Sequence, residues 1–246
     1  MIRKALIVYM TNSPSGELDG PACDYDNFCS FLTSSLGGEW YDNEIIPLEN
    51  PTKKQLKDKI LSMTGCDYAF TVFTGHGEFE TDDKLQYIEL MDGDVSIREL
   101  IVSCCKKQTI IIDACRGFFS MSQRLLEKAV SSSMESYYQY TSTRELYDSF
   151  LKDAEEGLTV LYAASENQTA LDTDHGAAYI LSLIGAAEIW DEGSNRKSML
   201  SLKEAHEKAI AYMKQKFPNT IQKPTMNGEK RLRYYPFAVK HQTLFL

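Results

Sequence analysis

Cys115 and His76 are the residues of this 246-residue sequence whose types and surroundings favour covalent chemistry. Each follows an apolar run, Cys115 within Asp-Ala-Cys-Arg-Gly and His76 between two glycines. A thiol becomes a nucleophile when a base takes its proton, and imidazole suits that task near neutral pH. The N–H groups of Gly77 and Cys115 would face a tetrahedral oxygen. Either loop alone is better explained as an ordinary glycine turn, so a Cys–His dyad is inferred only from the two together.

Buried strands are predicted directly before both residues. The runs Ala5–Met10, Tyr68–Thr74 and Thr109–Asp113 are almost continuously apolar, which is typical of strands covered on both faces. Helical patterns lie between these runs, and a βαβαβ order favours a mostly parallel sheet with helices on both faces. Sites in such sheets form beyond the carboxyl ends of the strands. We therefore expect an α/β fold in which His76 and Cys115 share one sheet edge.

The remaining elements follow from apolar spacing and from capping residues. Helices are predicted over Asp24–Leu36, from Pro51 to Gly65, after Ser96, over Gly176–Trp190 and over Ser201–Phe217. Strands are predicted over Glu44–Leu48, Lys84–Leu90 (a hairpin arm), Leu158–Ala164 and Tyr234–Val239. The segment from Phe118 to Gly157 has no sustained period, which predicts a mobile linker with at most short helices.

The composition excludes several classes of partner. The formal charge is −9, whereas binding to nucleic acid needs a clustered positive field. No apolar run approaches the roughly 18 residues that a membrane-spanning helix requires. The start of the chain lacks a small-residue cleavage site and is interpreted as a strand rather than a signal peptide. We expect a cytosolic protein without membrane or nucleic-acid partners, whose six cysteines are reduced thiols.

Two short segments resemble the catalytic motifs of caspase-like cysteine peptidases. Thr74–Gly77 is similar to the Ser-Gly-His-Gly segment of that family, and Asp113–Gly117 is similar to the caspase segment Gln-Ala-Cys-Arg-Gly. The likeness extends over nearly the whole chain, including the late segment Gln222–Pro224. It implies a cysteine endopeptidase, a hydrolase of peptidase family C14, with His76 and Cys115 as its catalytic residues.

The resemblance also implies an architecture. We expect a caspase-like α/β/α sandwich with a central, mostly parallel six-stranded sheet, formed by a single peptidase domain over residues 1–246. Residues 1–117 would correspond to the large subunit, residues 118–157 to the linker and residues 158–246 to the small subunit.

Asp113 stands where caspases have glutamine, and this departure bears on specificity. In metacaspases and paracaspases an aspartate here helps to form an acidic S1 pocket for Arg or Lys. Ser165–Asn167 lacks the arginine with which caspases bind aspartate. Asp172 and Asp24 match further S1 positions of these relatives, although a solvated loop acid and a helix N-cap are the respective alternatives. Carboxylates hold a guanidinium well, so we expect cleavage after a basic residue, with Arg preferred over Lys.

Activation is predicted only from the resemblance. Caspase relatives often mature by cleavage in the linker, and the basic residues available there are Arg124, Lys128, Arg144 and Lys152. An uncut linker that gates the pocket is the alternative, and activation by a partner protein is left open.

We expect no metal site and no required cofactor. Some metacaspases bind calcium through acid-rich loops, which would correspond to Asp82, Asp83, Asp92 and Asp94. Their spacing matches no known calcium loop and favours solvated turn acids.

Three other functions stay open at this point. The chain would be a caspase-like interaction module if catalysis had been lost, or an aspartate-specific peptidase if the acids served another purpose. A flavodoxin-like redox domain would need a phosphate-binding glycine loop after the first strand, and Thr11–Gly16 is a weak candidate for one.

Overall fold

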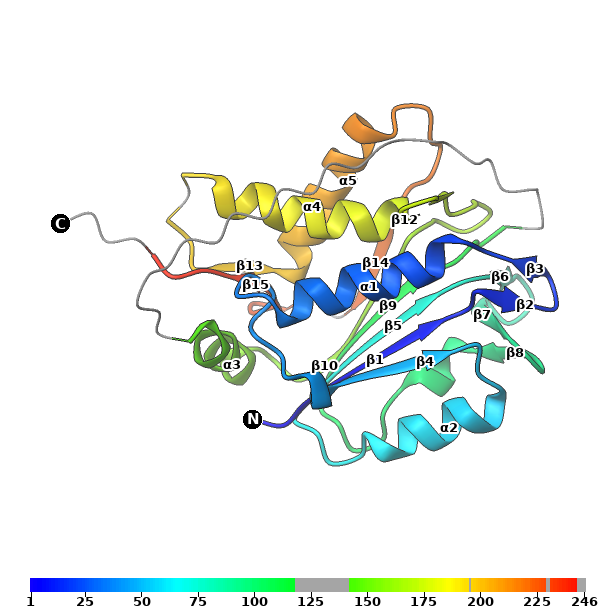
Figure 1. Ribbon diagram of the computed structural model, residues 1–246, viewed down its shortest axis with the longest axis horizontal. Helices are drawn as coiled ribbons and strands as arrows, with labels where there is room; N and C mark the ends of the chain where they lie inside the picture. The colour runs from blue at the N-terminus through cyan, green and yellow to red at the C-terminus, as the bar shows by residue number, and fades with distance from the viewer. Residues whose placement is uncertain (118–141, 195, 229–230, 243–246) are drawn as a thin grey trace.

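A six-stranded sheet forms the centre of the computed structural model, which describes residues 1–117, 142–194, 196–228 and 231–242 (Figure 1). The strand order is β14-β10-β9-β5-β1-β4, and every neighbouring pair is parallel except β10 with β14. The strands are β1 (Arg3–Tyr9), β4 (Ile45–Glu49), β5 (Tyr68–Thr74), β9 (Lys107–Asp113), β10 (Gly157–Tyr162) and β14 (Thr225–Gly228). The prediction of a mostly parallel six-stranded sheet is confirmed.

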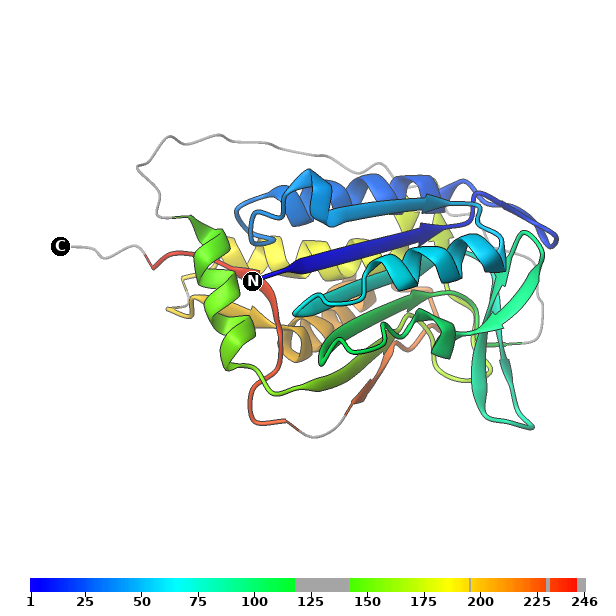
Figure 2. The same cartoon turned by 90° about the horizontal axis from the view of Figure 1, so that it is seen from below.

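Both faces of this sheet are covered, which explains the continuous apolar runs. Along β1, Ala5 and Ile7 pack into one core, while Leu6 and Val8 pack into the other. Helices α1 (Gly20–Thr33), α4 (Ala178–Glu192) and α5 (Leu202–Lys216) lie on the first face, and α2 (Lys53–Ser62) lies on the second (Figures 1 and 2). Among the described residues, no helix is long and apolar enough to cross a membrane.

The predicted helix starts are confirmed where a capping residue is present. Thr52 begins α2 with a capping box that includes Gln55, and Ser201 begins α5 with one that includes Glu204. Helix α1, in contrast, begins at Gly20 rather than at Asp24, because Pro21 in the first turn already has helical φ.

A small antiparallel sheet stands at the carboxyl end of the central sheet. It consists of β6 (Gly77–Glu80), β7 (Leu85–Leu90) and β8 (Gly93–Ser96), and the 3-10 helix η2 (Ile97–Leu100) follows it. Only one arm of it was predicted. The short pairs β2 (Asn12–Ser13) with β3 (Gly16–Glu17), and β11 (Asp172–Thr173) with β12 (Gly176–Ala177), lie at the same end (Figure 1).

Two elements were missing from the prediction. The predicted strand Tyr234–Val239 forms as β15 (Pro236–Val239) and pairs with β13 (Met199–Ser201), while the sixth strand of the central sheet is β14, which was not predicted. As an edge strand with partly exposed polar residues, β14 has no apolar pattern to reveal it. Within the predicted linker, Thr143–Asp153 forms a full helix, α3, which buries Tyr147 and Leu151.

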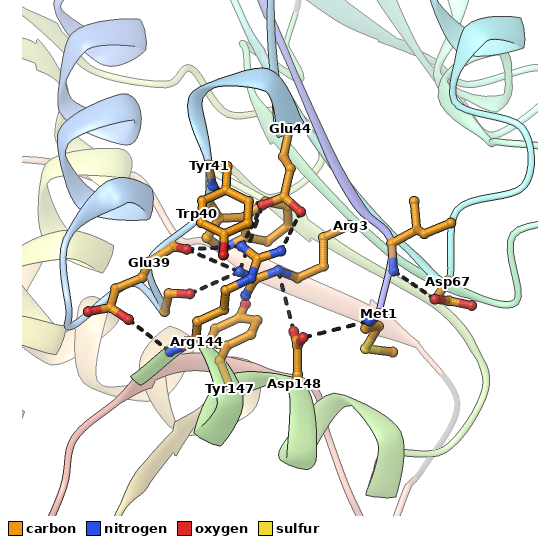
Figure 3. Close-up of polar contacts among 12 residues, drawn as sticks. Met1, Arg3, Glu39, Trp40, Tyr41, Glu44, Asp67, Arg144, Tyr147 and Asp148 are labelled. Carbon is orange, nitrogen blue, oxygen red and sulfur yellow. Dashed lines mark hydrogen bonds and ion pairs between the residues drawn. The ribbon is translucent and has the colours of Figure 1, made fainter. Parts of the chain in front are cut away.

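A buried group of charged and aromatic side chains attaches α3 to the amino end of the sheet (Figure 3). Arg3 is fully buried, stacks over the rings of Trp40 and Tyr147, and lies 3.4 Å from a carboxylate oxygen of Asp148. We call this group the arginine cluster; its members are Arg3, Trp40, Glu44, Arg144, Tyr147 and Asp148. Glu44 belongs to the 3-10 helix η1 (Asp42–Glu44) and accepts two hydrogen bonds from Arg144, at 2.6 and 2.7 Å.

Candidate active site

His76 and Cys115 come to one edge of the sheet because β5 and β9 are parallel neighbours. The register aligns Thr74 with Asp113, and the Gly75 N–H donates a hydrogen bond to the main-chain oxygen of Asp113 at 3.1 Å. His76 lies two residues after Thr74, and Cys115 lies two residues after Asp113. Both line one cleft of about 710 Å³ at the carboxyl ends of the strands. The structure therefore brings the two predicted catalytic residues together.

Gly77 and Cys115, the predicted oxyanion donors, both form part of the cleft wall. A Cβ at position 77 would lie 2.7 Å from the main-chain oxygen of Tyr87 and 3.0 Å from the Ala114 methyl group. Only glycine therefore lets the loop of His76 approach the segment of Cys115 this closely.

Burial favours the neutral forms of both His76 and Cys115. It lowers the pKa of His76, and the negative charge of Glu89 only partly opposes this shift. Burial also raises the pKa of the Cys115 thiol, and the nearby charges of Asp113 and Asp172 raise it further. The thiol lies 3.9 Å from the main-chain oxygen of Ala170. Both shifts favour the uncharged forms, a thiol for Cys115 and a neutral imidazole for His76.

Asp113 is buried in the wall of the same cleft, with 3% of its surface exposed. Its carboxylate accepts a hydrogen bond from the Ile180 N–H in the first turn of α4, but Oδ2 has no hydrogen-bond partner in the part of the chain that the structure describes. Burial raises the pKa of Asp113 well above its usual value, as do the charges of Asp24 and Asp172. A buried acid that lines a cleft and has a carboxylate oxygen without a partner is suited to bind a cation.

Asp172 stands at the N-terminus of α1, on another wall of the cleft. Its carboxylate accepts hydrogen bonds from the N–H groups of Gly20 and Thr173. A Cβ at position 20 would lie 1.8 Å from Oδ1 of Asp172, so this arrangement requires glycine there. Burial raises the pKa of Asp172 to about 6.

Asp24 does not line the cleft, in contrast to the S1 role that the resemblance implied, nor is it the N-cap of α1. It is fully buried inside α1, where its two oxygens accept hydrogen bonds from Thr74 (2.5 Å) and from the Ala177 N–H (2.8 Å). Burial raises the pKa of Asp24 to about 7. The hydrogen bonds of both oxygens connect α1 to β5 and β12. Asp24 is therefore a buried structural residue whose charge affects Asp113.

The cleft is acidic throughout the part that the structure describes. Its wall contains no Lys or Arg there, and its acids are Glu17, Glu78, Glu89, Asp94, Asp113 and Asp172. Of the acids considered for calcium, Asp94 lines the cleft, and the described residues contain no group of three or more His, Cys, Asp or Glu side chains that could hold a metal ion.

Sequence reasoning missed a clamp behind the nucleophile, formed by Gln86 and Arg116. The buried amide of Gln86 donates to the Cys115 main-chain oxygen at 3.1 Å and accepts from Arg116 Nε at 3.1 Å. The guanidinium of Arg116 lies over the rings of Phe79 and Tyr162, at 4.8 and 4.2 Å. The alternation of β7 places Gln86 on the same buried face as Ile88 and Leu90, and this pattern was the available signal.

The candidate processing residues fall in two groups. Arg124 and Lys128 lie outside the described residues. Arg144 and Lys152 lie in the first and last turns of α3, where Arg144 binds Glu44 and stacks over Tyr41 at 3.7 Å.

Sequence and structure comparisons agree on the class of protein that this fold and cleft define. Residues 2–235 match the caspase domain of peptidase family C14, so the chain belongs to this family of cysteine peptidases. The fold is similar to the crystal structure of caspase-1 from Spodoptera frugiperda, with a TM-score of 0.64 and 13% identity over 97% of this chain and 92% of that one. No curated protein sequence matches the chain. The predicted caspase-like α/β/α sandwich is confirmed.

Proposed function

We propose that this protein is a cysteine endopeptidase that cleaves after Arg or Lys, using Cys115 and His76 as a catalytic dyad. The observation that carries the proposal is Asp113, a buried acid in the wall of the cleft whose Oδ2 has no hydrogen-bond partner among the described residues. A guanidinium or ammonium group of the substrate would supply that partner, whereas an aspartate at the same place would add a further negative charge.

In the proposed reaction, His76 takes the proton of the Cys115 thiol as the sulfur attacks the peptide carbonyl carbon. The N–H groups of Gly77 and Cys115 stabilise the oxygen that becomes negative. The carbon–nitrogen bond then breaks, and the amine leaves with the proton from His76. Water hydrolyses the thioester between Cys115 and the substrate, which returns the thiol.

The acids of the S1 pocket also affect the nucleophile. The charges of Asp113 and Asp172 raise the pKa of the Cys115 thiol, in addition to the effect of burial. A bound cation neutralises these charges locally and so makes the thiolate easier to form. Binding of the correct side chain would therefore promote the chemical step as well as hold the substrate.

Arg is expected to be preferred over Lys because of geometry. A planar guanidinium presents several N–H donors in a fixed fork, which suits a pocket lined by two acids, Asp113 and Asp172. The ammonium group of lysine has no planar fork and interacts with the two acids only as a point charge.

If the chain matures by self-cleavage, we place the cut before Ser142 rather than within α3. Arg144 is held in a helix by two hydrogen bonds to Glu44, and Ser142 donates to Glu39 at 2.5 Å. Cleavage after Arg144 or Lys152 would require α3 to unwind and the arginine cluster to open. Arg124 and Lys128 are the remaining candidates from the sequence.

A covalent probe tests the dyad directly. An acyloxymethyl ketone on a peptidyl-arginine should add its mass to Cys115, and a peptidyl-aspartate version should label far more slowly. Cys115→Ala should remove labelling, and His76→Ala should abolish both labelling and turnover with the fold retained. Cys104→Ala and His175→Ala are the matched controls, since they replace an exposed thiol and the other histidine that precedes a glycine.

Labelling of a different cysteine would refute the assignment of the nucleophile. A chain that neither reacts with the probe nor hydrolyses any peptide would be a silent interaction module.

A further inference from the structure

Cys66 and Cys105 form a close pair of thiols at the end of the sheet opposite to the active site. Their Sγ atoms lie 3.2 Å apart, and each residue is only 6% exposed. Cys66 donates a hydrogen bond to the sulfur of Cys105, which in turn lies 3.3 Å from the main-chain oxygen of Lys107. This contact involves neither the cleft nor the dyad.

The position of the pair follows from the register of the two strands that carry the catalytic residues. The pairing of β5 with β9 begins with Tyr68 opposite Lys107, and Cys66 and Cys105 each precede this pair by two residues. The sulfurs need to approach by only about 1 Å to reach the bonding distance of about 2.05 Å.

The neighbouring Cys104 is oriented differently. It is exposed and has a φ of +65°, a left-handed conformation that non-glycine residues seldom adopt. This conformation turns the chain so that consecutive cysteines lie on opposite sides, Cys104 outward and Cys105 inward against Cys66. The arrangement selects Cys105, rather than its neighbour Cys104, as the partner of Cys66.

We propose that Cys66 and Cys105 are a redox modification site, at which a peroxide forms a disulfide that joins the starts of β5 and β9. Cys105 is the sulfur that reacts first, because the hydrogen bond from Cys66 lowers its thiol pKa. Its thiolate takes one oxygen from hydrogen peroxide to give a sulfenic acid and hydroxide. Cys66 then attacks that sulfur, the S–S bond forms and water leaves. Two thiols are oxidised by two electrons and one peroxide is reduced to water.

The expected consequence is greater stability rather than a change in the cleft. The disulfide would close a loop across 39 residues, which limits the unfolded chain. It would also hold together the two strands whose other ends carry His76 and Cys115. The site would thus protect the catalytic framework under oxidising conditions and remain independent of substrate.

The test uses the full chain with Cys115→Ala, so that the catalytic thiol cannot react. After treatment with hydrogen peroxide, one sample is unfolded in the presence of a maleimide, and its labels are counted by mass spectrometry. A second sample is digested without reduction to find the cross-linked peptide, and a third is denatured thermally. We expect two fewer maleimide labels, a cross-linked peptide that contains Cys66 and Cys105, and a thermal midpoint raised by about 5–10 °C that dithiothreitol reverses.

Two further variants make the test specific. Cys66→Ser should lose the cross-link and the change in midpoint, whereas Cys104→Ser, the matched control, should keep both. The proposal is overturned if the oxidised protein still labels fully at Cys66 and Cys105, or if the cross-link joins Cys66 to Cys104. If Cys66→Ser does not fold, the Cys115→Ala protein, which retains both Cys66 and Cys105, still decides the outcome. Its labels, cross-link and midpoint are compared before and after oxidation. Because Cys115 is absent, the result does not depend on the peptidase activity.

Discussion

The two ends of the central sheet differ in whether their buried charged groups have partners of opposite charge. At the amino end, the arginine cluster contains its own partners: Arg3 and Arg144 face Glu44 and Asp148, and aromatic rings cover the guanidinium groups (Figure 3). At the carboxyl end, the buried acid Asp113 lacks a cation among the described residues. The first arrangement stabilises the fold, and the second leaves a buried acid whose ionised form a cationic ligand would stabilise.

The pKa shifts at the two ends differ in sign for the same reason. Hydrogen bonds from Arg144 hold the pKa of Glu44 below its usual value in spite of burial. Burial without a cation raises the pKa of Asp172 to about 6 and that of Asp113 well above its usual value. A carboxyl group with its partner supplied is a structural element, whereas one without a partner is a candidate binding element.

The largest effect is expected from Asp113→Asn. The amide keeps the size of the side chain but removes the charge that would meet the substrate cation, so kcat/KM for a P1-Arg peptide should fall by about 10²–10³-fold. Asp148→Asn makes the same change at the amino end and should leave kcat/KM within about twofold while it lowers the thermal midpoint. Similar losses of kcat/KM in the two variants would remove the distinction between the ends.

Substitutions in the arginine cluster at the amino end should lower the stability of the fold rather than the activity. Glu44→Gln leaves Arg3 and Arg144 buried with one carboxylate fewer, which we expect to cost about 3 kcal/mol and to lower the thermal midpoint by about 6–12 °C. Peptide hydrolysis at 25 °C should be unchanged. Glu207→Gln, on the exposed surface of α5 beside Lys203, is the control and should change the midpoint by little. An equal shift in both variants would mean that the arginine cluster contributes no more than a surface pair.

Two buried glutamines, Gln86 at the carboxyl end and Gln108 at the amino end, allow a comparison in which smaller effects are expected. Gln86→Leu removes the clamp on the Cys115 carbonyl and should lower kcat about tenfold with KM nearly constant. Gln86→Glu still accepts from Arg116 but cannot donate to Cys115, so it should lose a similar part of kcat.

Gln108 is the matched control, since its amide donates to the main-chain oxygens of Val102 and Cys105 at the amino end. Gln108→Leu should lower the thermal midpoint without lowering kcat. If Gln86→Leu changed only the midpoint as well, the clamp would be structural and not a positioning element.

The smallest effect concerns the pH dependence of stability. The folded-state pKa of Asp172 is about 6, above an unfolded value of about 3.9, so the native state binds more protons between these values. Its contribution to stability is therefore present below about pH 4 and is lost as the pH rises through 6. Asp172→Asn should be more stable than the unsubstituted protein at pH 8, by about 1–2 kcal/mol, and should gain nothing at pH 4. Denaturant titrations at both pH values measure this, and a gain that is equal at pH 4 would contradict the shift.

The sequence predicted most of the framework because that framework rests on apolar periodicity. The strands β1, β5, β9 and β10 are covered on both faces and therefore appear as continuous apolar runs. The positions of His76 and Cys115 followed from the ends of two of these runs. Edge strand β14 and the first turn of α1 have no such pattern, and for that reason they were missed or misplaced.

The chemistry of the acids was less accessible to sequence reasoning than their positions. Asp24, Asp113 and Asp172 do gather at one edge, but only contacts distant in sequence separate their roles. Asp24 is engaged by Thr74 and Ala177, while Asp113 lines the cleft and has one oxygen without a hydrogen-bond partner among the described residues. The clamp of Gln86 on Cys115 is likewise a contact between residues 29 positions apart, which no local pattern announces.

The most direct test of the account is the ratio of kcat/KM for two fluorogenic peptides that are identical except for Arg or Asp at P1. The acidic cleft predicts that the purified protein hydrolyses the Arg peptide at least about 10³-fold more efficiently, and that Cys115→Ala hydrolyses neither. Efficient hydrolysis after Asp, with little or none after Arg, would contradict the account.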